Sequence, residues 1–148
     1  MGARNVSLIE SRRYLLLYLA SLLSLLNALW LGYVGWQKSQ VGGCPSCHLV
    51  PFLPVTDVGV AIVGMVASFI LAALCYFTIL KKGLKYITLI YAAFGAAFVS
   101  FLQISNLLLT GSLCPQCLVA SIGYYLVFGL LLYEVIINSL FICFSKQK

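Results

Sequence analysis

Charged residues are scarce in this chain of 148 residues. Only 8% of its residues are charged, nine Lys or Arg against three acids, whereas soluble domains carry about a quarter. So little charge cannot keep the surface of a water-soluble globule polar, which argues against that class. A disordered chain is excluded as well, because disorder needs low hydrophobicity and 63% of these residues are hydrophobic. The composition therefore predicts a membrane protein.

The basic residues outnumber the acids and give a formal charge of +6, yet they do not form a nucleic-acid-binding patch. They are scattered along the chain and adjoin apolar runs, a placement typical of membrane orientation signals. We therefore expect a membrane partner and no nucleic-acid partner.

Long apolar runs divide the chain into four predicted membrane spans. A helix needs about 20 apolar residues to cross the hydrocarbon core. The runs lie at about residues 14–36, 58–80, 86–109 and 114–136. The last two belong to one uncharged stretch that is too long for a single crossing, and Thr110, Gly111, Ser112 and Pro115 interrupt it. The predicted fold class is all-α, an integral membrane four-helix bundle in which residues 1–148 form a single domain.

The distribution of basic residues predicts how this bundle is oriented. Eight of the nine precede the first span, lie between the second and third, or follow the fourth; only Lys38 lies on the other side. By the positive-inside rule, both termini are cytoplasmic. The loop of residues 37–57 and the turn at 110–113 then face outward from the cell membrane.

Glu134 is the one acid within the predicted spans. It follows Cys114 by 20 positions, which is about 30 Å of helix at 1.5 Å per residue. That distance is the thickness of one bilayer core. We therefore expect Glu134 to be an interfacial charge among the opposite headgroups.

Four of the six cysteines form two copies of one motif on the predicted outer face, CPSC at residues 44–47 and CPQC at residues 114–117. Thiols outside the cytosol are not held reduced, so disulfides can persist there. Pro115 is favoured at the first helical position, which places Cys114 near a helix N-terminus that favours its thiolate. Cys117 follows one turn later on the same face, a spacing compatible with a disulfide. The two motifs predict redox-active cysteine pairs.

The first pair, Cys44 and Cys47, lies between two glycines and two prolines, a composition typical of an exposed loop. A thiol that reacts with a soluble partner must be accessible in this way. His48 directly follows Cys47. As a cation it would lower the pKa of the Cys47 thiol; it is equally consistent with a solvated loop histidine.

Polar side chains inside or beside the spans are candidate ligand contacts. Gln103 and Asn106 lie one turn apart in the third span, and Ser121 follows Cys117 by one turn. These three residues could hydrogen-bond the carbonyls of a bound quinone, or could join helices to one another. Asp57, at the start of the second span, could cap that helix or contact a ligand headgroup.

Other residues in the spans are expected to be structural. Cys75, in the second span, and Cys143, near the inner end of the fourth, fit buried thiols that act as small apolar residues. Ser21, Ser24 and Asn27 share one face of the first span, which we expect to pack against another helix.

Residues 108–118, LLTGSLCPQCL, resemble the signature of the vitamin K epoxide reductase family. Prokaryotic members of that family have a similar Gly-x-x-Cys-Pro-x-Cys-Leu at the start of their fourth helix, and a cysteine pair in the loop between their first two helices. The resemblance is close over about residues 100–125. It implies a role similar to that of the bacterial disulfide-bond-formation protein B: oxidation of a secreted thioredoxin-like thiol oxidase, with electrons passed to a quinone of the menaquinone or ubiquinone type.

The resemblance also implies a role for each outer cysteine. Cys117 would react with the quinone, and Cys114 would exchange with the loop. Cys44 would meet the partner, and Cys47 would pass electrons to Cys114. The loop cysteines of the family are usually several residues further apart than in CPSC, so the order of Cys44 and Cys47 stays open.

Two other interpretations fit the outer cysteines. Cys44, Cys47 and His48 also match the string that attaches a c-type haem, although His48 is the only histidine and Met65 lies inside a span, where it is poorly placed as a second axial ligand. The four outer cysteines could instead hold a structural zinc ion, although two whole spans separate the pairs.

Overall fold

The computed structural model of the chain describes residues 2–41, 57–111 and 115–145. Four long helices account for most of it: α1 (Gly2–Val41), α2 (Asp57–Leu80), α3 (Lys85–Thr110) and α4 (Pro115–Ser145). A short 3-10 turn, η1 (Lys82–Leu84), leads from α2 into α3. No strand occurs in these ranges, and the predicted all-α class is confirmed.

Each helix is long and apolar enough to cross a membrane. The apolar segments are Ser11–Gln40, Val58–Leu80, Lys85–Leu108 and Pro115–Ile137. The last three agree closely with the prediction, whereas the first is longer than the predicted 14–36 at both ends. The difference arises because a charged residue interrupts an apolar run without ending a helix, since Arg and Lys are good helix formers.

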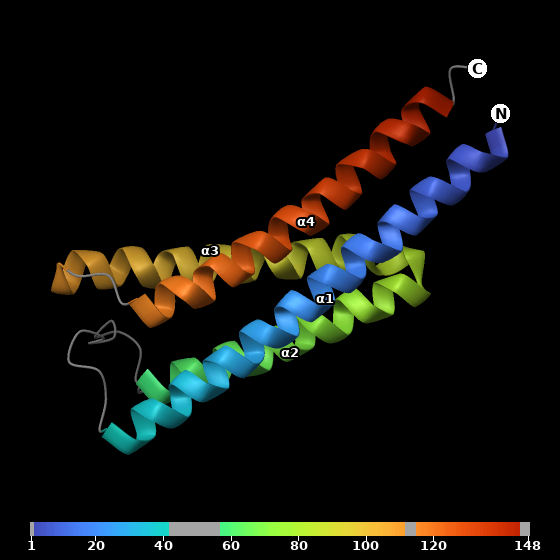
Figure 1. The fold of residues 1–148 in the computed structure, drawn as a ribbon. Coiled ribbons are helices and arrows are strands. Elements are labelled where there is room, and N and C mark those ends of the chain that lie inside the picture. The colour runs from blue at the N-terminus through green and yellow to red at the C-terminus, as the bar shows by residue number, and fades with distance from the viewer. Residues whose placement is uncertain (1, 42–56, 112–114, 146–148) are drawn as a thin grey trace.

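The helices run alternately in opposite directions, so both chain termini lie at one end of the bundle (Figure 1). We call this the terminal end. The opposite end, here called the loop end, carries the last residues of α1 and α3 and the first residues of α2 and α4 (Figure 1). Helix α1 packs against α2 and α4, and α3 packs against α4 and, less extensively, α2. Helices α2 and α4 are therefore diagonal neighbours.

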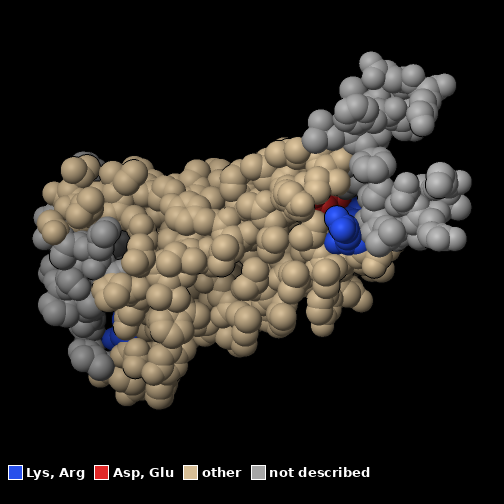
Figure 2. Space-filling model, turned by 45° about the horizontal axis from the view of Figure 1, so that its top comes forward, with Lys and Arg blue, Asp and Glu red and all other residues tan. Residues whose placement is uncertain are grey.

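Part of the interior of the bundle is an apolar core. Leu17, Leu71, Cys75, Val127 and Leu131 belong to one buried cluster. Cys75 is fully buried there, which confirms the prediction that it acts as a small apolar residue. On the face seen in Figure 2, charged side chains lie toward the two ends and an uncharged band lies between them, as a lipid-facing surface requires.

The turn between α3 and α4 begins at Gly111. This residue has a φ of 65°, in the left-handed region, and its N–H donates to the Leu107 oxygen at 2.9 Å. Glycine is the usual residue at such a helix end because it has no Cβ to clash. Helix α4 starts at Pro115, as predicted from the preference of proline for the first helical position.

Candidate functional site

Of the four predicted catalytic cysteines, the structure describes only Cys117. It lies in the first turn of α4 and is partly buried. Cys44, Cys47, Cys114 and the neighbouring His48 lie outside the described residues. The helix ends that border both cysteine motifs nevertheless lie together at the loop end of the bundle (Figure 1).

Gln103 of α3 and Ser121 of α4 meet beside Cys117. The Gln103 Nε2 donates to Ser121 Oγ at 2.5 Å and to the backbone oxygen of Cys117 at 3.4 Å. Ser121 Oγ donates to the same Cys117 oxygen at 2.7 Å. The structure thus brings two of the predicted quinone-binding residues to a predicted catalytic cysteine. In this arrangement Gln103 and Ser121 join α3 to α4. Joining helices was the alternative to quinone binding that the sequence analysis left open.

The other two predicted ligand contacts are less fully described. Asn106 is partly buried on α3, one turn nearer the loop end than Gln103. Asp57 is the first residue of α2, at the loop end, but its side chain lies outside what the structure describes.

Gln116, inside the CPQC motif, is a residue that the sequence analysis did not single out. Its backbone oxygen accepts a hydrogen bond from Trp30 Nε1 of α1 at 3.4 Å. Its side-chain Oε1 is buried and has no hydrogen-bond partner within residues 2–41, 57–111 and 115–145. An unmet buried acceptor costs about 1–3 kcal/mol, so Gln116 Oε1 suits a hydroxyl or thiol donor. The sequence could have indicated Gln116 by its position between the two cysteines of the predicted redox motif.

A second cluster of hydrogen-bonded side chains lies further from the loop end of the bundle. Tyr124 of α4 donates its hydroxyl to the Gly64 oxygen of α2 at 3.3 Å and accepts from Ser68 Oγ of α2 at 2.9 Å. Asn27 Nδ2 of α1 donates to the same Ser68 Oγ at 3.3 Å. The sequence analysis did not single out Ser68 and Tyr124. Each carries a hydroxyl in the middle of an apolar run, and this placement indicates that the hydroxyl bonds a neighbouring helix.

The polar face of α1 that contains Ser21, Ser24 and Asn27 contacts α2. Besides the bond from Asn27 to Ser68, Ser21 Oγ donates to the Ala72 oxygen of α2 at 3.1 Å. Ser24 Oγ bonds within α1, to the Ala20 oxygen at 2.8 Å. The prediction that this face packs against another helix is confirmed.

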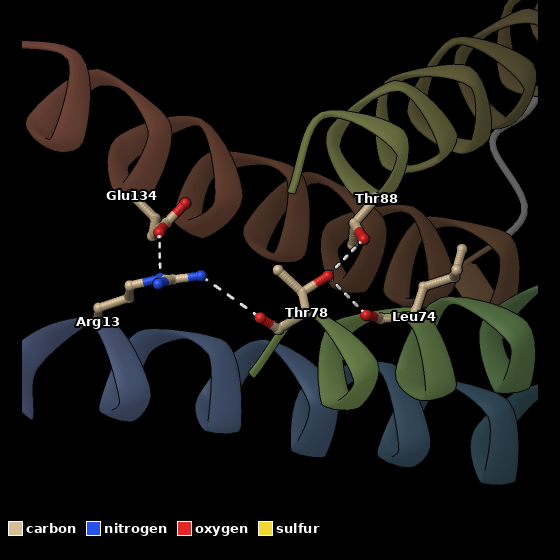
Figure 3. Close-up of polar contacts among 5 residues, drawn as sticks. All are labelled: Arg13, Leu74, Thr78, Thr88 and Glu134. Atoms are coloured by element: carbon tan, nitrogen blue, oxygen red, sulfur yellow. Dashed lines mark hydrogen bonds and ion pairs between the residues drawn. The ribbon is translucent and has the colours of Figure 1, made fainter. Parts of the chain in front are cut away.

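Glu134 is buried and paired with Arg13, so the expectation of a separate interfacial charge was wrong. Its carboxylate is 2% exposed and lies 2.9 Å from Nε of Arg13, which is 8% exposed (Figure 3). The reason is the length of α1: it extends toward the terminal end beyond the predicted span, so Arg13 is within the bundle and faces α4.

The ion pair belongs to a polar layer that joins all four helices. Arg13 Nη2 donates to the Thr78 oxygen near the end of α2 at 3.4 Å (Figure 3). The hydroxyls of Thr78 and Thr88 lie 2.7 Å apart and link α2 to α3. An arginine beside the last carbonyls of a helix also meets the negative end of the helix dipole. This layer lies where α2 ends and α3 begins, toward the terminal end of the bundle.

Comparisons of the chain with protein-family models, curated proteins and solved structures found no match. The chemistry of the site is therefore inferred from its own residues.

The described part of the loop end combines a cysteine with amide and indole groups. Cys117 lies in the N-terminal turn of α4, at the positive end of the helix dipole. Gln103, Gln116 and Trp30 place polar atoms within the same end of the bundle. Such a site can hold a reactive thiol next to a polar headgroup that enters from lipid.

Proposed function

We propose that the chain is a quinone-dependent thiol oxidase of the cell membrane that regenerates disulfides in a thioredoxin-like partner outside the cytoplasm. The observation that carries the proposal is the position of Cys117. It is partly buried in the first turn of α4, in contact with Gln103 and Ser121, at the end of the bundle where the helices bordering both cysteine motifs meet.

The proposed relay consists of two thiol–disulfide exchanges and one redox step. The partner dithiol reduces the Cys44–Cys47 disulfide and becomes a disulfide. The loop dithiol then reduces the Cys114–Cys117 disulfide, and the loop disulfide is restored. Finally the Cys114 and Cys117 thiols give two electrons and two protons to a quinone, which leaves as quinol. Each exchange requires a thiolate and an accessible disulfide sulfur.

The described residues suit a quinone headgroup near Cys117. A bound quinone supplies a lipid-soluble acceptor for two electrons and two protons. Gln103, Asn106 and Ser121 would hold its oxygens, with Asp57 near the same end of the bundle. The buried Gln116 Oε1, which lacks a donor among the described residues, would accept a hydrogen bond from a quinol hydroxyl or from a thiol.

The proposed sidedness rests on the basic residues. With both termini in the cytoplasm, the loop end faces the compartment where disulfides persist. The partner is then a secreted protein, and the net direction of electron flow is toward the quinone when the quinone is the stronger oxidant.

The test is turnover of the purified protein in detergent. A reduced thioredoxin-like protein is the electron donor, menaquinone or ubiquinone is the acceptor, and quinone absorbance is the readout. Replacing Cys44, Cys47, Cys114 or Cys117 with Ser is expected to abolish turnover. Cys75→Ala is the matched control, because Cys75 is buried in the apolar core away from the loop end. Near-wild-type turnover of Cys117→Ser would contradict the proposal.

A further inference from the structure

Tyr124 connects two helices that do not pack against each other. Among the described residues, no Cα atom of α2 lies within 8 Å of a Cα atom of α4. The Tyr124 hydroxyl crosses this gap, with Ser68 Oγ at 2.9 Å and the Gly64 oxygen at 3.3 Å. It therefore couples the positions of α2 and α4 directly, without an intervening helix.

The ring of Tyr124 is held on several sides. The residue is 4% exposed. A Cβ atom at Gly95 of α3 would lie 2.9 Å from the Tyr124 ring, so a glycine is required for the ring to fit there. Ser68, its partner on α2, is itself held by Asn27 of α1. Contacts from α2 and α3, together with the bond by which α1 holds Ser68, thus leave the hydroxyl little freedom.

The two helices joined by Tyr124 are those that begin beside the two cysteine motifs. Helix α2 begins at Asp57, after the segment that contains CPSC, and α4 begins at Pro115, within CPQC. Tyr124 follows Cys117 by seven residues, so the two share one face of α4 and are separated by about 10 Å along the helix. A change in the spacing of α2 and α4 at Tyr124 would be transmitted to their loop ends.

We infer that Tyr124 is a positioning residue for the exchange between the two cysteine pairs, an inference that rests on the proposed function. Its hydroxyl fixes the separation of the loop ends of α2 and α4. This raises the effective concentration of the loop thiol at Cys114, on which the rate and equilibrium of an intramolecular exchange depend.

The test measures that effective concentration in the full-length protein in detergent. One parent, Cys44→Ala with Cys117→Ala, keeps Cys47 and Cys114, and a second keeps Cys44 and Cys114. Each is equilibrated with glutathione: two protein thiols and one oxidised glutathione give one protein disulfide and two reduced glutathiones. The parent that forms the disulfide more readily then receives Tyr124→Phe, which keeps the ring and removes the hydroxyl.

The effective concentration is expected to fall about fivefold in Tyr124→Phe, the factor that one neutral hydrogen bond supplies. Ser68→Ala removes the same hydrogen bond from the side of α2, and we expect it to lower the effective concentration by a similar factor. If Tyr124→Phe does not fold, Ser68→Ala therefore provides the test. The matched control is Tyr125→Phe. Tyr125 is the next residue of α4 and also bonds a serine, Ser100 Oγ at 2.6 Å, but it is exposed on the outer surface.

The outcomes separate the inference from the proposed function. An unchanged effective concentration in both Tyr124→Phe and Ser68→Ala, or an equal loss in Tyr125→Phe, would overturn the positioning role. Failure of both parents to form the disulfide would overturn the relay itself, and the inference with it.

Discussion

The ion pair of Arg13 and Glu134 is the least expected contact in the bundle. Charges within a membrane span are costly unless they are paired or reach water. Here a carboxylate that is 2% exposed has a guanidinium 2.9 Å away, and that guanidinium also contacts the end of α2. Neither charge has to reach the headgroups to be stabilised, since each is the other's partner.

Removing one charge of this pair should destabilise the protein strongly. Glu134→Gln leaves the Arg13 guanidinium buried without its counter-charge, so we expect the free energy of unfolding to fall by about 3 kcal/mol. Unfolding in mixed detergent micelles, followed by circular dichroism, measures the change. Arg12→Gln is the control: Arg12 is adjacent in sequence but exposed, so its loss should change stability by less than about 1 kcal/mol.

The double variant Arg13→Glu with Glu134→Arg tests whether pairing is the cause. It should recover part of the stability lost in Glu134→Gln, because a pair of opposite charges is restored. A Glu134→Gln protein as stable as the wild type would show that the pair does not hold the terminal end together.

Helices α1 and α4 approach each other closely at Gly123. A Cβ atom at this position would lie 2.7 Å from Asn27 Oδ1 and 2.9 Å from Asn27 Cγ. Small residues at such crossings let membrane helices pack, since lipid supplies no hydrophobic drive for their association. Gly123 thereby allows Asn27 to bond Ser68.

Gly123→Ala is expected to push Asn27 away from Ser68 and lower the free energy of unfolding by about 1–3 kcal/mol, as overpacking does in well-packed cores. Gly129→Ala on the same helix is the control. Nothing lies within 4 Å of its Cβ position, so the higher helix propensity of alanine should leave stability equal or slightly greater. Equal effects of the two substitutions would contradict the packing described for Gly123.

The sequence predicted both ends of α2 and α3 and the start of α4 well, because the apolar length needed to span a bilayer and the breaks at Gly111 and Pro115 are both local signals. It did not predict that α4 continues to Ser145, beyond the apolar segment. It also selected Gln103 and Ser121 by their spacing. It did not predict that they bond each other, that Tyr124 meets Ser68, or that Arg13 faces Glu134. These contacts depend on how each helix is rotated about its axis. Helices apolar on every side give little periodicity from which to infer that rotation.

The whole bundle has two chemically different ends. Toward the terminal end, a polar layer that contains Arg13, Thr78, Thr88 and Glu134 joins the four helices. The loop end carries Cys117 and Gln116 Oε1, which has no hydrogen-bond partner in the part of the chain that the structure describes. The proposed thiol chemistry would take place at the loop end only, on a single side of the membrane, so the orientation of the protein can be tested independently of its activity.

Labelling of intact cells tests this orientation. After mild reduction, a membrane-impermeant maleimide is expected to label Cys44 and Cys47 from outside. A cysteine introduced by Lys148→Cys, in a Cys143→Ser background, should react only after the membrane is permeabilised. The reverse pattern would place the cysteine motifs in the cytoplasm and remove the basis for a role in extracytoplasmic disulfide formation.

The transfer of electrons from the CPQC thiols to a quinone is tested most directly by a single turnover. Fully reduced protein is mixed without oxygen with one equivalent of menaquinone, and both quinol and protein disulfide are counted. We expect one quinol for each protein disulfide formed, whether at Cys114–Cys117 or, after exchange, at Cys44–Cys47, and no quinol from Cys117→Ser. Quinol formation by Cys117→Ser at the wild-type rate, or none by the wild-type protein, would contradict the proposed activity.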